Sequence, residues 1–233
     1  MFRSIVCVML LLAQQAGFEV ATIKPGHGTA IGNRFAPELM GYTNAPLSVL
    51  IQSAYGIQAY QLAGGPAWVR LDPWDIAAKP SAPVTSNRMA VMHEMLKGLL
   101  AERFHLELHR EMWELPVYSL VVGKNGHKMG PAASKGLRAG ADFLSGSSSM
   151  PNFAFFLAGQ VGRPVTDKTG LDGEFEFKLE YDPDLGALPE AGAAPNRPTI
   201  FTAIQEQMGL KLEPGKAPVE VLVIDRVEKP SEN

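Results

Sequence analysis

Residues 92–122 carry apolar side chains first at helical spacing and then in alternation. The segment MHEMLKGLLAERF has the three- and four-residue spacing of an amphipathic helix, whereas HLELHREMWELPVYSLVV has the two-residue period of strands. The pattern predicts a helix that runs straight into two antiparallel strands, with a turn between them.

The same order of elements returns from residue 200 onward, in IFTAIQEQMGLKLEPGKAPVEVLVIDRV. An offset of 104 residues places Phe104 on Met208 and Val117 on Val221, so apolar positions fall on apolar positions. A recurring set of elements indicates an internal repeat. We therefore expect an α+β fold of two related small units, each with two helices packed on a mainly antiparallel sheet.

The first unit is expected over residues 17–123. It begins with FEVATIK, residues 18–24, whose alternation predicts a strand. Residues 26–41 predict a polar loop, and a short helix then ends at Gly56. Its other predicted elements are strands at residues 58–62 and 74–79 and the helix and strands described above.

Residues 124–149 are rich in Gly, Ala and Ser, which predicts a linker with little fixed structure. The second unit follows over residues 150–233. It is expected to begin with a helix, and EFEFKLEY at residues 174–181 predicts a strand with one apolar and one polar face. Residues 182–198 predict a loop, after which Thr199 caps the last helix.

The first sixteen residues have the layout of a secretory signal peptide. One positive charge at Arg3 precedes the apolar run IVCVMLLLA, and small residues at Ala13 and Ala16 offer a cleavage site. The run is shorter than the roughly 20 residues of a membrane-spanning helix. We therefore expect a signal peptide over residues 1–16, export to the periplasm or the exterior, and no transmembrane segment in the mature chain. Cys7, the single cysteine, would leave with the signal.

Composition sets limits on the partners. The chain has 21 Lys and Arg against 24 Asp and Glu, with a net charge of -3. The basic residues are scattered and form no stripe that could follow a phosphate backbone, so we expect no nucleic-acid binding. We also expect no cofactor.

Several blocks, in order along the chain, carry a family resemblance. They are FEVATIKP, LIQSAYGIQAYQLAGGPAW, WDIAAKP, MLKGLLAERFHLELHREMWELPVYSLVVGKNG, GRPVTDKTGLDGEFEFKLEYDPD, AIQEQMGLKLE and VEVLVIDRVEKPSEN. Together they resemble a soil-associated family of uncharacterised exported bacterial proteins. The resemblance implies an uncharacterised domain without an assigned reaction, which some members carry fused to a sensor-type membrane metallopeptidase. A weaker likeness, in element order, is to the short N-terminal domains of secretins and TonB-dependent receptors, which are docking or signalling modules.

Two local patterns resemble catalytic motifs but are incomplete. Asp167 begins DKTG, the start of the phosphorylation motif of P-type ATPases, but Leu171 replaces the required Thr; the segment is therefore interpreted as a tight turn. His93 and Glu94 begin a zinc-peptidase motif that Lys97 breaks, because a second His belongs there.

A metal site is an alternative on the strand after the long helix. His105, Glu107 and His109 alternate with leucines, so their side chains would share one face, and these residue types bind Zn²⁺. The alternative reading is an exposed polar face without a metal.

Aromatic residues suggest a binding surface for sugars or peptides. The candidates are Tyr55, Tyr60, Trp68, Trp74 and Trp113. Aromatic side chains beside a Gly-Gly-Pro turn also lock such turns onto a core, so a structural role is the competing interpretation.

These observations favour an exported, non-catalytic binding or interaction module of the bacterial cell envelope, which docks on an envelope protein through a strand edge or another surface. Two alternatives stay open. One is an envelope hydrolase with a metal on His105, Glu107 and His109, and the other is a sensor ectodomain acting on a separate membrane partner.

Overall fold

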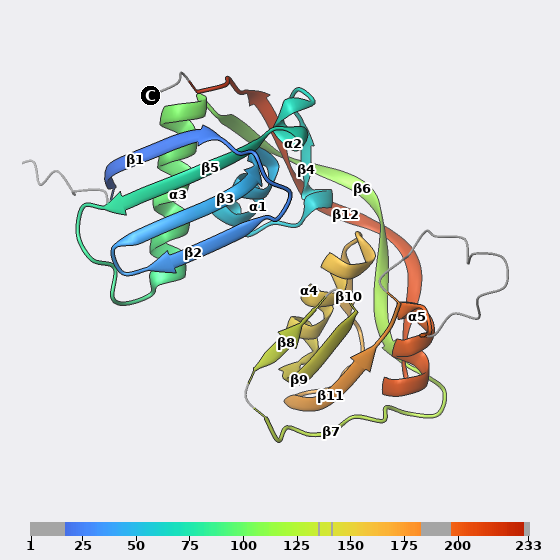
Figure 1. Cartoon of the computed structure of the whole chain (residues 1–233). Helices are drawn as coiled ribbons and strands as arrows, with labels where there is room; N and C mark the ends of the chain where they lie inside the picture. The colour runs from blue at the N-terminus through green and yellow to red at the C-terminus, as the bar shows by residue number, and fades with distance from the viewer. Residues whose placement is uncertain (1–16, 135, 141, 183–196, 231–233) are drawn as a thin grey trace, which may run out of the picture. The chain divides into compact units, whose positions relative to one another are not determined.

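The computed structural model describes residues 17–134, 136–140, 142–182 and 197–230. They form helices and three four-stranded sheets, which confirms the α+β class (Figure 1). The chain divides into two compact units. Among the described residues, unit 1 consists of residues 17–56, 65–107 and 225–230, and unit 2 of residues 57–64 and those between 108 and 224. Each unit therefore draws on separate segments, whereas the sequence predicts two successive segments.

Unit 1 contains an antiparallel sheet, here called sheet A, with the strand order β1-β5-β3-β2. Its strands are β1 (Phe18–Pro25), β2 (Gly32–Ala36), β3 (Leu39–Pro46) and β5 (Pro73–Pro80). Its helices are α1 (Leu47–Tyr55), α2 (Trp68–Leu71) and α3 (Arg88–Phe104). Helices α1 and α3 lie against one face of the sheet (Figure 1).

The core of unit 1 lies between this face and the two helices. Leu96 and Leu100 of α3, Leu50 of α1, and Met40 and Ile76 of the sheet are at most 2% exposed. Helix α1 ends at Gly56, as predicted, because glycine there takes the left-handed conformation that closes a helix (φ 63°). The predicted loop at residues 26–41 is wrong in part, since it contains β2 and the start of β3.

Unit 2 contains a second antiparallel sheet, sheet C, with the order β7-β11-β9-β8. Its strands are β7 (Gly130–Pro131), β8 (Leu137–Ala139), β9 (Phe143–Ser149) and β11 (Glu174–Glu180). Its helical segments are α4 (Met150–Val161), α5 (Ile200–Ala203) and the π-helical turn η2 (Ile204–Met208). The predicted strand at residues 174–181 and the Thr199 cap, which accepts a hydrogen bond from the Thr202 N–H, are both confirmed.

The prediction of a linker with little fixed structure over residues 124–149 is wrong. The segment holds β7, β8 and β9, and β9 pairs with β11 along its whole length. Its Ser147 and Ser148 are only 3% exposed. The apolar periodicity that marks a strand is missing because hydroxyl side chains, rather than apolar ones, occupy these two buried positions. Residues 183–196, most of the second predicted loop, lie outside the described residues.

A third sheet, sheet B, has the order β10-β6-β12-β4 and belongs almost wholly to unit 2. Its strands are β4 (Leu62–Gly64), β6 (Glu107–Val122), β10 (Val165–Asp167) and β12 (Leu210–Arg226). The 3-10 turn η1 (Ala59–Gln61) leads into β4. The two predicted hairpins are wrong, because each of them is one long strand in the structure, β6 or β12 (Figure 1).

Candidate functional site: a groove between an edge strand and a helix

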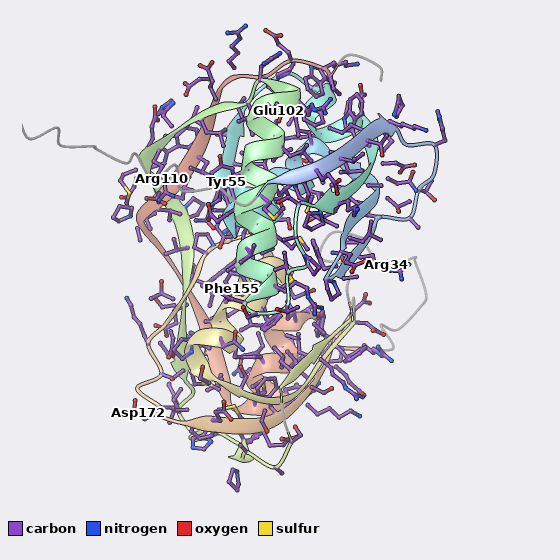
Figure 2. The ribbon with its side chains drawn as sticks, turned by 90° about the vertical axis from the view of Figure 1, so that its left-hand side faces the viewer. Arg34, Tyr55, Glu102, Arg110, Phe155 and Asp172 are labelled. Carbon is purple, nitrogen blue, oxygen red and sulfur yellow. The ribbon has the colours of Figure 1, made fainter. Side chains whose placement is uncertain are left out.

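A groove of about 1120 Å³ lies beside α3 in unit 1. One wall is the start of β1, residues 17–21, and the other is the flank of α3 between Asn87 and Arg103. Figure 2, with Glu102 labelled, shows α3 along its length and β1 beside it. The volume lies at the upper end of the range of small-ligand pockets, about 300–1,000 Å³, and is large enough for a chain segment.

Small side chains on α3 make room for the groove. Ala90 and Gly98 face it, and a Cβ added at Gly98 would meet no atom within 4 Å. At the base lie Met95 and Leu99, which are about 4% and 5% exposed and belong to the core. The groove is therefore an open space over a packed floor.

Charged side chains border the groove in ion pairs. Glu19 lies 3.0 Å from Lys79, Glu94 lies 2.7 Å from Lys97, and Glu102 lies 3.2 Å from Arg103. The hydrogen bond from Glu19 raises the pKa of Lys79. The carboxylates of these pairs are solvent-exposed, so the pairs add little to stability.

Strand β1 offers a free edge beside this groove. It is the first strand in the order of sheet A, so among the strands that the structure describes it pairs with β5 alone. The register of this pairing shifts between Phe18 and Val20, and Val20 is 59% exposed. An edge strand with unpaired backbone groups is a template for an incoming strand.

A smaller hollow of about 240 Å³ adjoins the end of α3 and shares two groove residues, Glu102 and Arg103. It also includes His105 and Glu228, whose Nε2 and Oε2 atoms lie 4.0 Å apart. The buried Nε of Arg103 lacks a well-aligned hydrogen bond, although it lies 3.2 Å from Glu102 Oε1.

The structure does not bring the three predicted metal ligands together. His105 takes a left-handed conformation (φ 47°) at the end of α3 and precedes β6, so the alternation that would align it with Glu107 does not hold. Glu107 pairs with Arg226 at 3.9 Å. His109 pairs with Glu111 at 2.8 Å.

Across the described residues, no group of three or more His, Cys, Asp or Glu side chains could hold a metal ion.

The five aromatic residues predicted to form a binding surface do not lie together on one surface. Trp74 is 6% exposed and packs edge-on against Phe104, with ring centroids 5.5 Å apart, so the prediction of a surface role is wrong for this ring. Its Nε1 has no hydrogen-bond partner among the described residues. The ring of Tyr55 lies 5.0 Å from the Lys97 ammonium.

The other three aromatic candidates also have their own local contacts. Trp68 lies 5.7 Å from the Lys229 ammonium. Trp113 donates to Glu111 at 2.5 Å, and it is 38% exposed. Tyr60 is partly buried, which raises its pKa. None of the five predicted aromatics lines the groove.

The DKTG segment forms the predicted tight turn. The Asp167 carboxylate accepts hydrogen bonds from the Thr169 N–H at 2.9 Å and hydroxyl at 2.8 Å, while Gly170 and Gly173 take positive φ. This is the geometry of a capped turn, in which Asp167 has a structural partner for its carboxylate.

Sequence reasoning missed a polar cluster in sheet C. The carboxylate of Glu176 on β11 accepts hydrogen bonds from the hydroxyls of Ser147 and Ser134 and from two backbone N–H groups, those of Ala133 and Ser134. These donors lower the pKa of Glu176 to about 2. The cluster ties the segment before β8 onto the sheet, and the serine-rich composition was its only signal in the sequence.

No helix among the described residues has the length and apolar character needed to cross a membrane.

Comparison with known proteins gives one match. The model of a family described as protein of unknown function (DUF3738) matches residues 48–227. This range includes α3 but begins after β1, so only one wall of the groove lies within it. No curated protein and no solved structure matches the chain.

Proposed function

We propose that this chain, which belongs to the DUF3738 family of proteins of unknown function, is an exported, non-catalytic binding module of the bacterial cell envelope. The observation that carries the proposal is the groove of about 1120 Å³ that runs beside the free edge of β1. Its occupant, in this proposal, is an extended segment of an envelope protein.

An extended segment fits both walls. Its backbone would pair with the outer edge of β1, which supplies affinity through main-chain hydrogen bonds. Alternate side chains of an added strand point to one face, so every second residue would enter the groove over Ala90 and Gly98. The exposed Val20 would be covered in the same step.

The chemistry of the groove supports binding rather than catalysis. Its lining includes no Ser, Thr, Cys, His or Lys that could act as a nucleophile or base. The carboxylates of Glu19, Glu94 and Glu102 are held in ion pairs instead. These pairs form a charged rim around an apolar floor, which is the usual arrangement of a docking surface.

We also propose that residues 1–16, which lie outside the described residues, are a signal peptide, and that the rest of the chain consists of two related copies. The strand orders support the second statement. Sheet A has the order β1-β5-β3-β2 and sheet C has β7-β11-β9-β8, so each strand has a counterpart at the same place in the sheet and in the chain.

Two matched variants test the docking proposal. Gly98→Trp places a large ring in the groove where a Cβ has open space. Ala101→Trp places the same ring on an exposed position of α3 that does not line it. A displayed library of random linear peptides is selected on the chain from Gly17 onward, and the selected peptides are then tested on both variants.

We expect Gly98→Trp to weaken the selected peptides by at least tenfold and Ala101→Trp to leave their affinity unchanged. Circular dichroism and thermal unfolding confirm that both variants are folded. Peptides that bind both variants equally would contradict the proposed site, and so would a selection that enriches no peptide.

A further inference from the structure

The central part of the long β6–β12 pair buries almost nothing. In sheet B the two strands lie side by side (Figure 1). Every residue from 109 to 114 on β6 is exposed, and so is every residue from 213 to 216 on β12. Arg110 is ion-paired with Glu220, so these two exposed stretches are offset along the pair of strands. The buried side chains sit toward the ends, at Leu120 on β6 and at Leu212 and Leu222 on β12. A two-stranded ribbon without a packed face has little stability of its own.

Turn residues occupy this exposed centre. Pro214 and Gly215 are the fifth and sixth of the 17 residues of β12. Proline followed by glycine is the preferred pair for the two central positions of a type II turn, which requires a positive φ at the glycine. Gly215 does not take a positive φ here. The strand therefore runs straight through a sequence that favours a turn.

The short strands pair with the long strands in a reciprocal way. β10 pairs in parallel with residues 118–120 of β6, and β4 pairs in parallel with residues 222–224 of β12. The repeat offset of 104 residues makes these two stretches equivalent. Each copy thus supplies its last strand to the short strand of the other copy.

We infer that sheet B is the exchanged form of two hairpins, and that the chain also has a closed form. In the closed form each long strand folds back at its own centre. Residues 222–224 then pair with β10, and residues 118–120 pair with β4. The inference rests on the proposed relation between the two copies, but not on the proposed docking groove.

The two forms make nearly the same contacts. Exchange of an identical element leaves the parallel pairings in place, with the partner supplied from the other copy. What differs is the pairing between the two long strands around Arg110 and Glu220, which the exchanged form has and which the closed form replaces by two turns. Most side chains in this region are exposed, so the closed form is accessible without unfolding sheets A and C.

Cysteine pairs within β12 test for the closed form. Lys211 is seven residues before Pro218 and nine before Glu220. At about 3.3 Å per residue these pairs are roughly 23 and 30 Å apart in a straight strand. A disulfide needs Cα atoms within about 7 Å. The variants Lys211→Cys with Pro218→Cys, and Lys211→Cys with Glu220→Cys, cover two registers of the turn.

The control pair reports the exchanged form. Arg110 on β6 and Glu220 on β12 are ion-paired at 2.8 Å, so Arg110→Cys with Glu220→Cys is expected to cross-link across the two strands. All variants start at Gly17 and so lack Cys7, the chain's single cysteine. Dilute protein is oxidised, and free thiols and intact mass are measured over time.

We expect the control to lose both thiols, and at least one of the two β12 pairs to lose both as well, as a monomer with an internal disulfide. Retention of both thiols by the two β12 pairs, while the control cross-links, would overturn the closed form. Disulfide-linked dimers without an internal bond would overturn it too.

Discussion

Sheets A and C have the same strand order, yet they differ at one edge. The strand at the first place is β1 in sheet A, with eight residues, and β7 in sheet C, with two. β7 consists of Gly130 and Pro131, and proline has no N–H to donate to a neighbouring strand. The same topology therefore carries a usable edge in one sheet and a blunt edge in the other.

The last helix is also longer in unit 1 than in unit 2. α3 has 17 residues and presents an exposed flank beside β1, whereas α5 has four residues and continues as a π-helical turn of five. The strand order alone therefore does not produce a groove. The groove is present in unit 1 because β1 and α3 are long there.

Removal of an aromatic ring from either core is expected to lower the free energy of unfolding most. Trp74 on β5 and Phe177 on β11 occupy corresponding strands, each 6% exposed and packed edge-on against another ring, Phe104 or Phe153. Trp74→Ala and Phe177→Ala should each lower the free energy of unfolding by about 3–5 kcal/mol. Denaturant unfolding measures this, and a loss below about 1 kcal/mol at either site would contradict equivalent cores.

The stability of sheet C is expected to depend on pH through the Glu176 carboxylate. Sheet C relies on hydrogen bonds to Glu176, whose pKa is lowered from 4.5 to about 2. The carboxylate therefore stabilises the fold above its unfolded-state pKa, and this stability is lost as the pH falls through about 2. Glu176→Gln should flatten the fall of the unfolding temperature between pH 4.5 and about 2.

The control for this experiment lies on the same strand. Glu174 is exposed, and Glu174→Gln should keep the pH profile of the unaltered chain. If both variants give the same profile as that chain, the cluster around Glu176 has no part in the acid response of sheet C.

The smallest expected change in the free energy of unfolding is that of a glycine substitution in α3. Gly98 lies inside α3 with open space around a Cβ, so Gly98→Ala should raise the free energy of unfolding by about 0.5–1 kcal/mol. In sheet C, Gly146 has φ 123° and a Cβ would collide with the carbonyl oxygen of Gly136, so Gly146→Ala should be destabilising. Thermal unfolding compares the two, and a destabilised Gly98→Ala would argue against an open groove flank.

The sequence was sufficient where apolar side chains decide the structure. The alternation of residues 18–24 and 174–181 and the helical spacing before Phe104 predicted β1, β11 and α3. It was insufficient for β9, where Ser147 and Ser148 fill buried positions and the Glu176 carboxylate accepts a hydrogen bond from the Ser147 hydroxyl. It also failed for β6 and β12. Pro214 and Gly215 favour a turn within β12, whereas pairing between strands that are far apart in the sequence keeps β6 and β12 each as one long strand.

The candidate site was beyond sequence reasoning for a related reason. The groove joins residues 17–21 to a helix flank some seventy residues later, and no motif marks either wall. Trp74 and His105 were predicted as site residues from their residue types. In the structure Trp74 packs against Phe104 in the core, and His105 caps the end of α3.

The most direct test of the docking groove is hydrogen–deuterium exchange of the backbone amides with and without a selected peptide. We expect slower exchange over residues 18–22 of β1 and along the groove flank of α3. We expect no change in β2, the strand at the opposite edge of the same sheet. Protection of β2 instead, or binding without any protection of β1, would contradict the docking groove.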